Sequence, residues 1–289
     1  MIQRTSHYSN DGARAWHSPE PLEPPVQDAS PAPTRTTPVS GLLGSGLHVA
    51  AIMDGNGRWA SRLGMSRSEG HRAGVLSVRR AVRAARELGV SVLSLYVFSA
   101  DNWKRPRAEV RGLLRLLRSY LRSEASRLLE ASIRLTVIGS REGLPEGLLG
   151  AIAAAEERTA AGAKMRLRVA INYSGRDAIR VASAGGWTDA PPTREEFRRS
   201  LGRAMNDPAP PDNVDIMIRT GGERRLSDFL LWESAYAELF FTPTPWPDFD
   251  EAEFREILRS FRGRQRTFGR LPDRDHDALV RQGGQRWTG

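Results

Sequence analysis

The stretch HVAAIMDGNGRWA, His48 to Ala60, starts as a run of apolar residues and ends abruptly in the carboxylate of Asp54. The apolar run is typical of a buried strand, and Gly55 and Gly57 let the backbone turn and approach a ligand closely. A carboxylate at the end of a strand can bind a hard cation such as Mg²⁺, and the fork of Arg58 matches phosphate oxygens. The stretch therefore indicates a strand that ends in a site for a metal and a phosphate group, or else a glycine turn with a solvated acid and arginine.

Short strand-like runs alternate with longer helical patterns from Leu47 onward. The runs are LHVAAIM, VSVLSLYVF, IRLTVIG, RLRVAIN, VDIMIR and ELFFT, and the helical patterns cover residues 72–88, 107–131, 146–161, 175–184 and 193–206. Several of the runs are apolar on both faces, as buried parallel strands are. The alternation predicts an α/β fold in which one central, mostly parallel sheet of six strands is flanked by helices.

Polar side chains gather directly after four of the predicted strands. They occupy residues 54–58, 99–103, 172–176 and 219–223. In an open α/β sheet, ligands bind at the carboxyl ends of the strands. We therefore expect these four loops to form one site.

Candidate phosphate donors occur in two groups: Arg58, Arg67 and His71 follow the first strand, and Arg219, Arg225 and Ser227 follow the fifth. Guanidinium forks suit phosphate oxygens, and a histidine beside an anion can donate a hydrogen bond or move a proton. Two such groups on one sheet edge indicate two anionic groups held near one metal. The alternative is that Arg219 and Arg225 form weak surface ion pairs with Glu223 and Glu233.

Aromatic residues crowd the same loops: Trp59, Phe98, Trp103, Phe229, Trp232 and Tyr236. Stacking on a nucleotide would explain some of them, and contact with a hydrocarbon substrate would explain them as well. The helical pattern over 107–131 carries an apolar stripe made of Val110, Leu113, Leu114, Leu117, Tyr120 and Leu121. This stripe either packs on the sheet as core or also forms the wall of an apolar cavity.

The composition narrows the class of protein. The chain has 289 residues, no cysteine and a net charge of +9, so disulfides, thiolate nucleophiles and cysteine metal sites are excluded. No run approaches the roughly 20 apolar residues of a membrane span, and no signal-peptide pattern is present, so we expect a cytoplasmic protein. The positive charge suits nucleic acid, acidic lipid or a phosphorylated substrate. Residues 1–45, rich in Pro, Ser, Thr and Gly, are expected to be a disordered tail.

Five separated segments together resemble the cis-prenyltransferase family, which includes undecaprenyl diphosphate synthase. They are HVAAIMDGNGRWA, GHRAG, LYVFSADNWKRP, INYSGRDAI and DIMIRTGGERRLSDFLLWESAYAELFFTPTPWPDF, in the family's order. The resemblance covers about Leu47 to Gly269, so we expect a catalytic domain over 46–270 and a C-terminal tail over 271–289. A Walker lysine motif, a GxGxxG after a strand and the DDxxD pattern of trans-prenyltransferases are all absent from the sequence.

The resemblance implies a Mg²⁺-dependent reaction in which isopentenyl diphosphate extends an allylic diphosphate, usually farnesyl diphosphate, with a new cis double bond and release of pyrophosphate. It also implies a hydrophobic tunnel for the growing chain, a homodimer, and transient contact with a membrane surface at the inner face of the membrane. The expected product is a long polyprenyl diphosphate of the undecaprenyl type, for the lipid carrier of cell-wall glycans. Nucleic acid is not an expected partner.

The resemblance also assigns roles to residues of this sequence. The expected metal ligands are Asp54 and Glu238, and the expected catalytic residues are Asp54 and Asn102. The allylic diphosphate is expected at Gly55, Asn56, Gly57, Arg58 and Arg67, with Trp59, His71 and Arg105 nearby. The isopentenyl diphosphate is expected at Arg219, Arg225 and Ser227. Ser99, Asp101 and Trp103, in the mobile loop after the second strand, are also expected to bind substrate. Phe98 and Trp103 would order this loop and shield the hydrocarbon.

Four positions depart from the family pattern. Asp101 stands in place of Glu, Ser174 in place of Gly, and Asp228 in place of Asn. In the C-terminal segment RQRTFGR, which resembles a tail that helps complete the site, Arg270 follows where a second Gly is usual. None of these changes removes a principal phosphate or metal group.

Three alternative functions stay open at this point. A short-chain cis-prenyl diphosphate synthase would share every motif, and only the closure of the tunnel would differ. A non-catalytic subunit of a prenyltransferase complex would share the fold. A nucleic-acid-binding protein is suggested by charge alone and would bind less tightly as salt rises.

Overall fold

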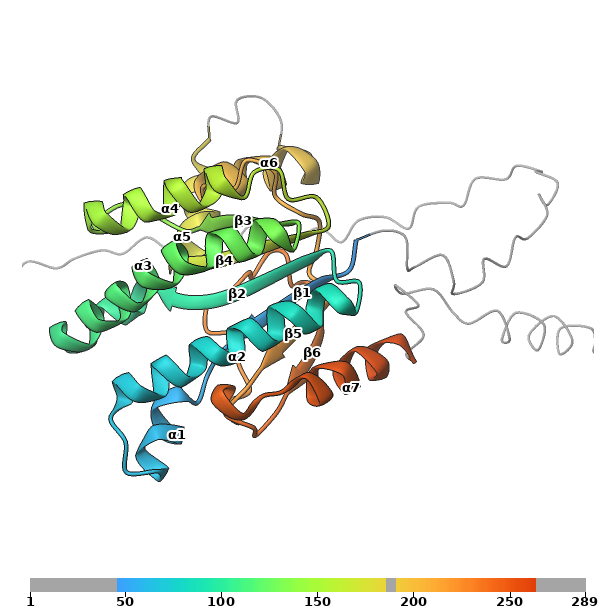
Figure 1. The fold of residues 1–289 in the computed structure, drawn as a ribbon. Helices are drawn as coiled ribbons and strands as arrows, with labels where there is room; N and C mark the ends of the chain where they lie inside the picture. Colours follow the sequence, from blue (N-terminus) through green and yellow to red (C-terminus); the bar gives the residue numbers. More distant parts are fainter. Residues whose placement is uncertain (1–45, 186–190, 264–289) are drawn as a thin grey trace, which may run out of the picture. The chain divides into compact units, whose positions relative to one another are not determined.

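The computed structural model describes residues 46–185 and 191–263, and Figure 1 shows their fold. The expectations for the tail at 1–45, the tail at 271–289 and the RQRTFGR segment lie outside the described residues. No helix in the described ranges is long and apolar enough to cross a membrane.

A six-stranded sheet forms the centre of the fold, in the order β3-β4-β2-β1-β5-β6. All five pairs of neighbouring strands are parallel. The strands are β1 (His48–Ile52), β2 (Val92–Ser99), β3 (Ile133–Ile138), β4 (Met165–Tyr173), β5 (Ile216–Arg219) and β6 (Glu238–Phe241). The predicted α/β class and all six predicted strands are confirmed.

The strand order decides where a ligand can bind. Strand β1 pairs with β2 on one side and with β5 on the other, so the direction in which the sheet grows reverses at β1. In open parallel sheets, a crevice opens at such a reversal, outside the carboxyl ends of the strands. The segment after β1, which starts with Met53 and Asp54, lies in that crevice.

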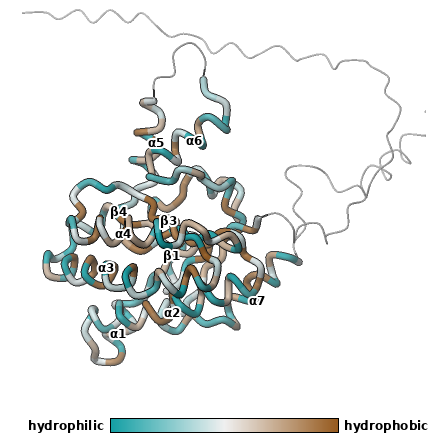
Figure 2. Tube along the Cα trace, turned by 45° about the horizontal axis from the view of Figure 1, so that its top comes forward, coloured by the Kyte–Doolittle hydropathy of each residue, from teal (hydrophilic) through white to brown (hydrophobic). Residues whose placement is uncertain are grey.

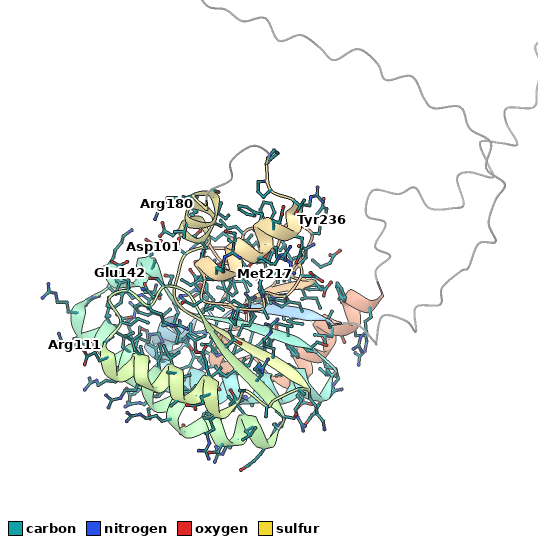
Figure 3. All side chains as sticks on the ribbon, turned by 90° about the horizontal axis from the view of Figure 1, so that it is seen from above. Asp101, Arg111, Glu142, Arg180, Met217 and Tyr236 are labelled. Carbon is teal, nitrogen blue, oxygen red and sulfur yellow. The ribbon has the colours of Figure 1, made fainter. Side chains whose placement is uncertain are left out.

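Two layers of helices cover the sheet. Alternate residues of a strand point to opposite faces, and both faces carry apolar side chains that need to be covered. One face packs on α2 (Arg67–Glu87), α3 (Arg107–Glu130), α4 (Glu146–Arg158) and α7 (Glu251–Arg262), and Val49 and Ala51 of β1 belong to this core. The other face packs on α5 (Gly175–Ser183) and α6 (Arg194–Ala204), where Ala50 and Ile52 are buried. Apolar residues gather along the strands in Figure 2, while α2 and α3 alternate between polar and apolar. In Figure 3, Met217 lies within the fold, and Arg111 and Arg180 lie at its periphery.

Two helices were not predicted. The helix α1 (Asn56–Arg62) has only 7 residues, too few for a periodic pattern to appear, and α7 begins after Asp250, whose carboxylate accepts the Glu253 N–H. Short 3₁₀ turns, η2 (Ala100–Lys104) and η3 (Trp246–Asp248), complete the described elements. The predicted helix at 72–88 begins earlier, at Arg67, because Ser66 and Glu69 form a capping box.

Candidate active site

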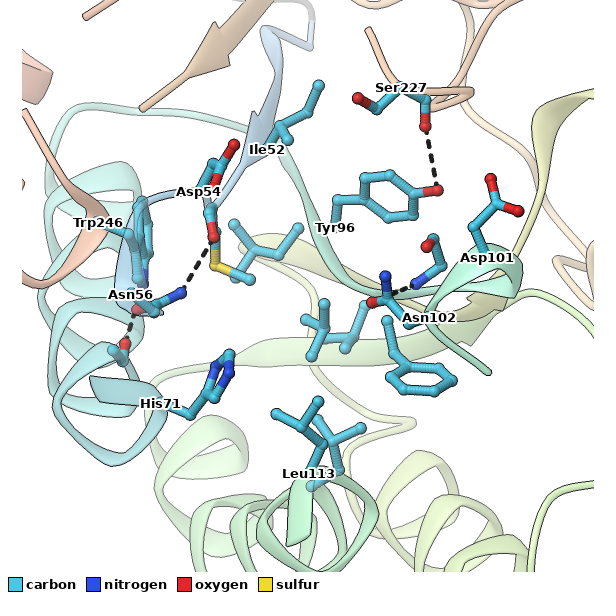
Figure 4. Close-up of a pocket in the computed structure, with 18 of the residues that line it drawn as sticks. Ile52, Asp54, Asn56, His71, Tyr96, Asp101, Asn102, Leu113, Ser227 and Trp246 are labelled. Atoms are coloured by element: carbon cyan, nitrogen blue, oxygen red, sulfur yellow. Dashed lines mark hydrogen bonds between the residues drawn. The ribbon is translucent and has the colours of Figure 1, made fainter. Parts of the chain in front are cut away.

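A cavity of about 840 Å³ opens at the carboxyl ends of β1, β2 and β5. Its mouth is polar, with Asp54, Asn56, His71, Asn102 and Ser227 around it (Figure 4). Its apolar lining comes from α2, α3 and the sheet: Val75, Val78, Leu95, Val97, Leu113, Leu116, Leu117, Tyr120 and Val169. A cavity with an apolar lining is thus present where the hydrophobic tunnel is expected. Part of the stripe on α3 forms its wall, while Leu114 and Leu121 are buried in the core.

Asp54 lies between two groups of cations. Its Oδ2 accepts a hydrogen bond of 2.9 Å from Arg219 Nη2, and its Oδ1 accepts one of 2.6 Å from Gly55 N and lies 3.3 Å from Arg58 Nη2. Burial by itself would raise the pKa of Asp54, but the hydrogen bonds from Arg219 and Gly55 and the charges of Arg219 and Arg58 hold it below its usual range. Asp54 is thus an anion at neutral pH.

The glycine turn after Asp54 is packed too closely for side chains. Gly55 has φ 101°, and a Cβ there would lie 2.9 Å from Pro245. A Cβ on Gly57 would lie 3.1 Å from Arg67 Nε. Gly55, Asn56 and Gly57 all line the cavity, so the turn brings backbone to the mouth of the cavity and leaves room for the arginine beside it.

Two residues of the first group, Arg67 and His71, converge with Arg105 on Glu109, which sequence reasoning missed. Arg105 Nη1 lies 3.2 Å from Glu109 Oε1, and Arg67 Nε and His71 Nε2 each lie 3.8 Å from the same oxygen. Burial lowers the pKa of His71, and the charge of Arg105 lowers it further, against the opposing effect of Glu109. Arg105 lies two residues before α3, and its i,i+4 spacing to Glu109 in the first turn of that helix is the signal that could have identified Glu109.

Arg219 organises the second group. Its side chain is 5% exposed, and its Nη1 donates to the Arg225 carbonyl and to Ser227 Oγ, both at 2.6 Å, while Nη2 reaches Asp54. Arg225 forms an ion pair with Glu223 at the rim. The surface-pair alternative is therefore correct for Arg225 and Glu223, but Arg219 pairs with Asp54. Glu233 is buried, and burial raises its pKa.

The loop after β2 forms the η2 turn. Ser99 N donates to Asn102 Oδ1 at 3.2 Å, and Ser99, Asp101 and Asn102 line the cavity. Trp103 packs edge-on against Phe98, with ring centroids 5.4 Å apart, and its Nε1 donates to Asn172 at 2.8 Å. Trp103 thus packs against the turn but does not line the cavity, whereas Phe98 does, so the structure does not bring Trp103 to the place expected of a substrate-binding residue.

Glu238 is not brought to Asp54. Glu238 is the first residue of β6 and pairs in register with Ile216, whereas Arg219 pairs with Phe241. Three residues of parallel strand span about 10 Å, so Glu238 lies toward the amino end of the sheet, away from the mouth of the cavity. The described residues contain no group of three or more His, Cys, Asp or Glu side chains that could hold a metal. The expectation that Asp54 and Glu238 share one ion is thus not met within the described part of a single chain.

Several expected residues lie beside the cavity or away from it. Arg58 lines an adjoining cavity of about 460 Å³ together with Arg67. Trp59 Nε1 donates to Asp248 at 2.7 Å and does not line the main cavity. Trp232 packs against Phe197 of α6, and Tyr236 is 59% exposed, so neither of these aromatic residues contacts the site.

Two aromatic residues at the site were not predicted as binding residues. Tyr96 lines the cavity, stacks on Phe229 with centroids 4.4 Å apart, and donates from its hydroxyl to the Ser227 carbonyl at 3.3 Å. Trp246 lines the opposite side and donates to the Gly74 carbonyl at 2.9 Å. Each connects two segments that meet only in the folded chain, which is why no local pattern revealed them.

Comparison with known proteins places this geometry in a family. Residues 52–269 match the family model described as putative undecaprenyl diphosphate synthase. The chain belongs to this family of prenyltransferases. It is 52% identical over 225 residues to isoprenyl transferase 1 of Bradyrhizobium diazoefficiens, covering 78% of this chain and 90% of the relative. It is 44% identical over 230 residues to the ditrans,polycis-undecaprenyl-diphosphate synthase of Shewanella oneidensis, described as specific for (2E,6E)-farnesyl diphosphate, covering 77% of this chain and 82% of the relative.

Solved structures agree with the family assignment. Lavandulyl diphosphate synthase from Lavandula x intermedia, solved in complex with dimethylallyl diphosphate, matches with a TM-score of 0.70 and 34% identity, over 77% of this chain and 97% of the other. A probable undecaprenyl diphosphate synthase from Campylobacter jejuni matches with a TM-score of 0.64 and 30% identity, over 78% of this chain and 100% of the other. The prenyltransferase is therefore an enzyme with the cis-prenyltransferase fold.

Proposed function

We propose that this prenyltransferase condenses isopentenyl diphosphate onto an allylic diphosphate, farnesyl diphosphate in the first instance, and builds a long polyprenyl diphosphate. The observation that carries the proposal is Asp54, an ionised carboxylate hydrogen-bonded to Arg219 and close to Arg58, at the mouth of an apolar cavity. Two cationic groups with one carboxylate between them suit two diphosphates and one divalent ion. The cavity suits the hydrocarbon that both substrates carry.

The allylic diphosphate is assigned to the turn at Gly55–Arg58 and to Arg67, His71 and Arg105. The three basic side chains now converge on Glu109, which keeps the group together before a diphosphate arrives. When the allylic carbon–oxygen bond breaks, negative charge develops on the leaving diphosphate, and these donors stabilise it. The lining formed by α2 and α3 receives the prenyl chain and excludes water from the allylic cation.

The isopentenyl diphosphate is assigned to Arg219, Arg225 and Ser227. Its alkene carbon has no charge, so the diphosphate is the handle by which the enzyme aims it at the allylic carbon. Once the new carbon–carbon bond has formed, the isopentenyl unit must lose a proton to restore a double bond. An oxygen of the released diphosphate is the proposed acceptor, and Asn102, which lines the cavity, is proposed to assist through a hydrogen bond.

Asp54 is suited to bind a magnesium ion, but no second protein carboxylate is assigned to the ion beside it. Mg²⁺ commonly uses one or two carboxylates, substrate phosphate oxygens and several waters. Asp54 is ionised, and its side chain is 32% exposed, so its oxygens are accessible from the mouth of the cavity. When bound, the ion would neutralise charge on the diphosphates. Glu238 is not assigned to it here.

The enzyme is proposed to act as a homodimer on the inner face of the membrane. In the described residues β6 has a neighbouring strand on one side only, and Trp232, Tyr236 and Leu239 near it are 38%, 59% and 45% exposed. At the turn between α1 and α2, Leu63 is 58% exposed and lies between the exposed Arg62 and Arg67. Apolar and basic side chains together favour transient contact with anionic lipid, where the product would enter the cell-wall carrier pathway.

The test is mass analysis of the products that the purified protein makes from farnesyl and isopentenyl diphosphates, with Mg²⁺ and with EDTA. We expect long polyprenyl diphosphates that disappear with EDTA and return when Mg²⁺ is restored. Products that stop after one or a few additions would favour the short-chain synthase, which would bind its two diphosphates with the same donor residues. No product with several metals and allylic primers would contradict the proposal and favour the non-catalytic subunit.

A further inference from the structure

Two of the departures from the family pattern, Ser174 and Asp228, contact each other. Ser174 Oγ donates to Asp228 Oδ2 at 2.6 Å, although the residues are 54 positions apart. Ser174 is also the N-cap of α5, and its oxygen accepts the Asp177 N–H at 3.1 Å. Ser174 Oγ thus accepts one hydrogen bond, from Asp177 N, and donates its proton in the other, to Asp228 Oδ2. The two departures thus act as a pair that links α5 to the loop after β5.

Asp228 is tied to the first turn of α5 by two more hydrogen bonds. Its Oδ1 accepts the Arg176 N–H at 2.9 Å, and its carbonyl accepts the Gly175 N–H at 2.9 Å. A Cβ on Gly175 would lie 2.7 Å from the Asp228 carbonyl oxygen, so only glycine permits this approach. A carboxylate is also favoured at the amino end of a helix. Three bonds therefore fix Asp228 on α5.

The backbone at this point is sterically disfavoured. Ser227 and Asp228 have φ of 48° and 67°, a left-handed conformation that residues with a Cβ rarely adopt. Such a pair persists only where the surroundings hold it. Asp228 is anchored on α5, and the next residue, Phe229, is stacked on Tyr96. In this conformation Ser227 Oγ lies 2.6 Å from Arg219 Nη1.

We propose that Asp228 is a positioning residue for the isopentenyl diphosphate site. By binding the amino end of α5, it holds the strained segment that presents Ser227 and the Arg225 carbonyl to Arg219. Asp228 itself lines the cavity. Its two carboxylate oxygens accept hydrogen bonds from Ser174 Oγ and Arg176 N, and we therefore assign its effect to the position of Ser227. The inference rests on the proposed function, because it takes Arg219, Arg225 and Ser227 to bind isopentenyl diphosphate.

The experiment measures kcat and the KM for each of the two diphosphates. Asp228→Ala is expected to raise the KM for isopentenyl diphosphate about tenfold, the factor that corresponds to about 1.4 kcal/mol, and to leave the KM for the allylic diphosphate unchanged. Asp228→Asn is expected to have a smaller effect, because the amide oxygen still accepts from Arg176 N and the NH₂ group can donate to Ser174. The matched control is Asp250→Ala, which removes a carboxylate that caps α7 through Glu253 N at 2.9 Å. The control should lower Tm and leave both KM values unchanged.

Ser227→Ala separates failure of this inference from failure of the proposed function. If Ser227→Ala leaves the KM for isopentenyl diphosphate unchanged, the assignment of that substrate to this group is wrong. The positioning role is overturned if Ser227→Ala raises the KM for isopentenyl diphosphate but Asp228→Ala leaves both KM values unchanged. It is also overturned if Asp228→Ala raises both KM values equally. Should Asp228→Ala fail to fold, Asp228→Asn and Ser174→Gly each perturb the link more mildly. An unchanged KM for isopentenyl diphosphate in both would also overturn the role.

Discussion

Replacing Asp54 by Asn tests whether the ion pair with Arg219 serves catalysis or stability. The change keeps the shape of the side chain and removes its charge. Arg219 is 5% exposed, and removing one partner of a buried pair costs about 3–5 kcal/mol. Asp54 is 32% exposed, so solvent screens the pair, and we expect about 1–2 kcal/mol. For a domain of this size, 1 kcal/mol lowers Tm by about 2–4 °C, so the expected loss is about 2–8 °C.

The effect on turnover is expected to be much larger than the effect on stability. Loss of a group that stabilises charge in the transition state typically lowers kcat about 10²–10³-fold, equivalent to about 2.7–4 kcal/mol. The assay is incorporation of labelled isopentenyl diphosphate at saturating Mg²⁺, with thermal unfolding measured on the same samples.

Asp207→Asn is the matched control. Asp207 pairs with Arg168 at 2.9 Å, both side chains are 0% exposed, and neither lines the cavity. We expect Asp207→Asn to lower Tm more than Asp54→Asn does and to leave kcat within about threefold at a temperature where the protein is folded, because a fully buried pair is screened least. If Asp54→Asn retained turnover similar to that of Asp207→Asn, the role of Asp54 in the reaction would be refuted.

Two further perturbations follow from the cavity and from a buried histidine. Along α3 the residues that line the cavity run from Leu113 to Tyr120, a side chain whose pKa is raised by burial. Replacing the ring by Tyr120→Ala should leave room for a longer chain, so we expect products longer by at least about one isoprene unit in mass analysis. Unchanged product lengths would show that the ring does not limit the chain. Burial, with the charge of Arg168, lowers the pKa of His48 to about 3. Between about pH 6.5 and pH 3, the unfolded state therefore binds more protons than the folded state. The free energy of unfolding is unaffected by this group above the window, and as the pH falls through the window it decreases by up to about 1.4 kcal/mol per pH unit. His48→Gln should flatten the fall of Tm between pH 7 and 4, and an equally steep fall would exclude His48 as its source.

Local patterns were sufficient to predict the strands, their parallel arrangement and the edge of the sheet at which the polar loops meet. A buried strand and the loop that follows it are contiguous in the chain, so the apolar run of β1 and the turn from Asp54 to Arg58 appear together in the sequence. The same holds for Arg219 and the residues just after it. The family resemblance added the tunnel and the prenyltransferase activity, which composition and periodicity do not reveal.

The partners of these groups were decided by the tertiary structure. Asp54 and Arg219 are 165 residues apart and meet because β1 and β5 are neighbours in the sheet, a pairing that no local pattern encodes. Glu109 reaches Arg67 only because α2 and α3 pack on the same face of the sheet. Glu238 illustrates the opposite case, since its place at the first residue of β6 puts it at the far end of the strand from Asp54. The sequence by itself therefore determined which chemical groups stand at the ends of the strands. Strand order and register determined which of these groups come within hydrogen-bonding distance, because contacts between distant segments depend on how the whole sheet is assembled.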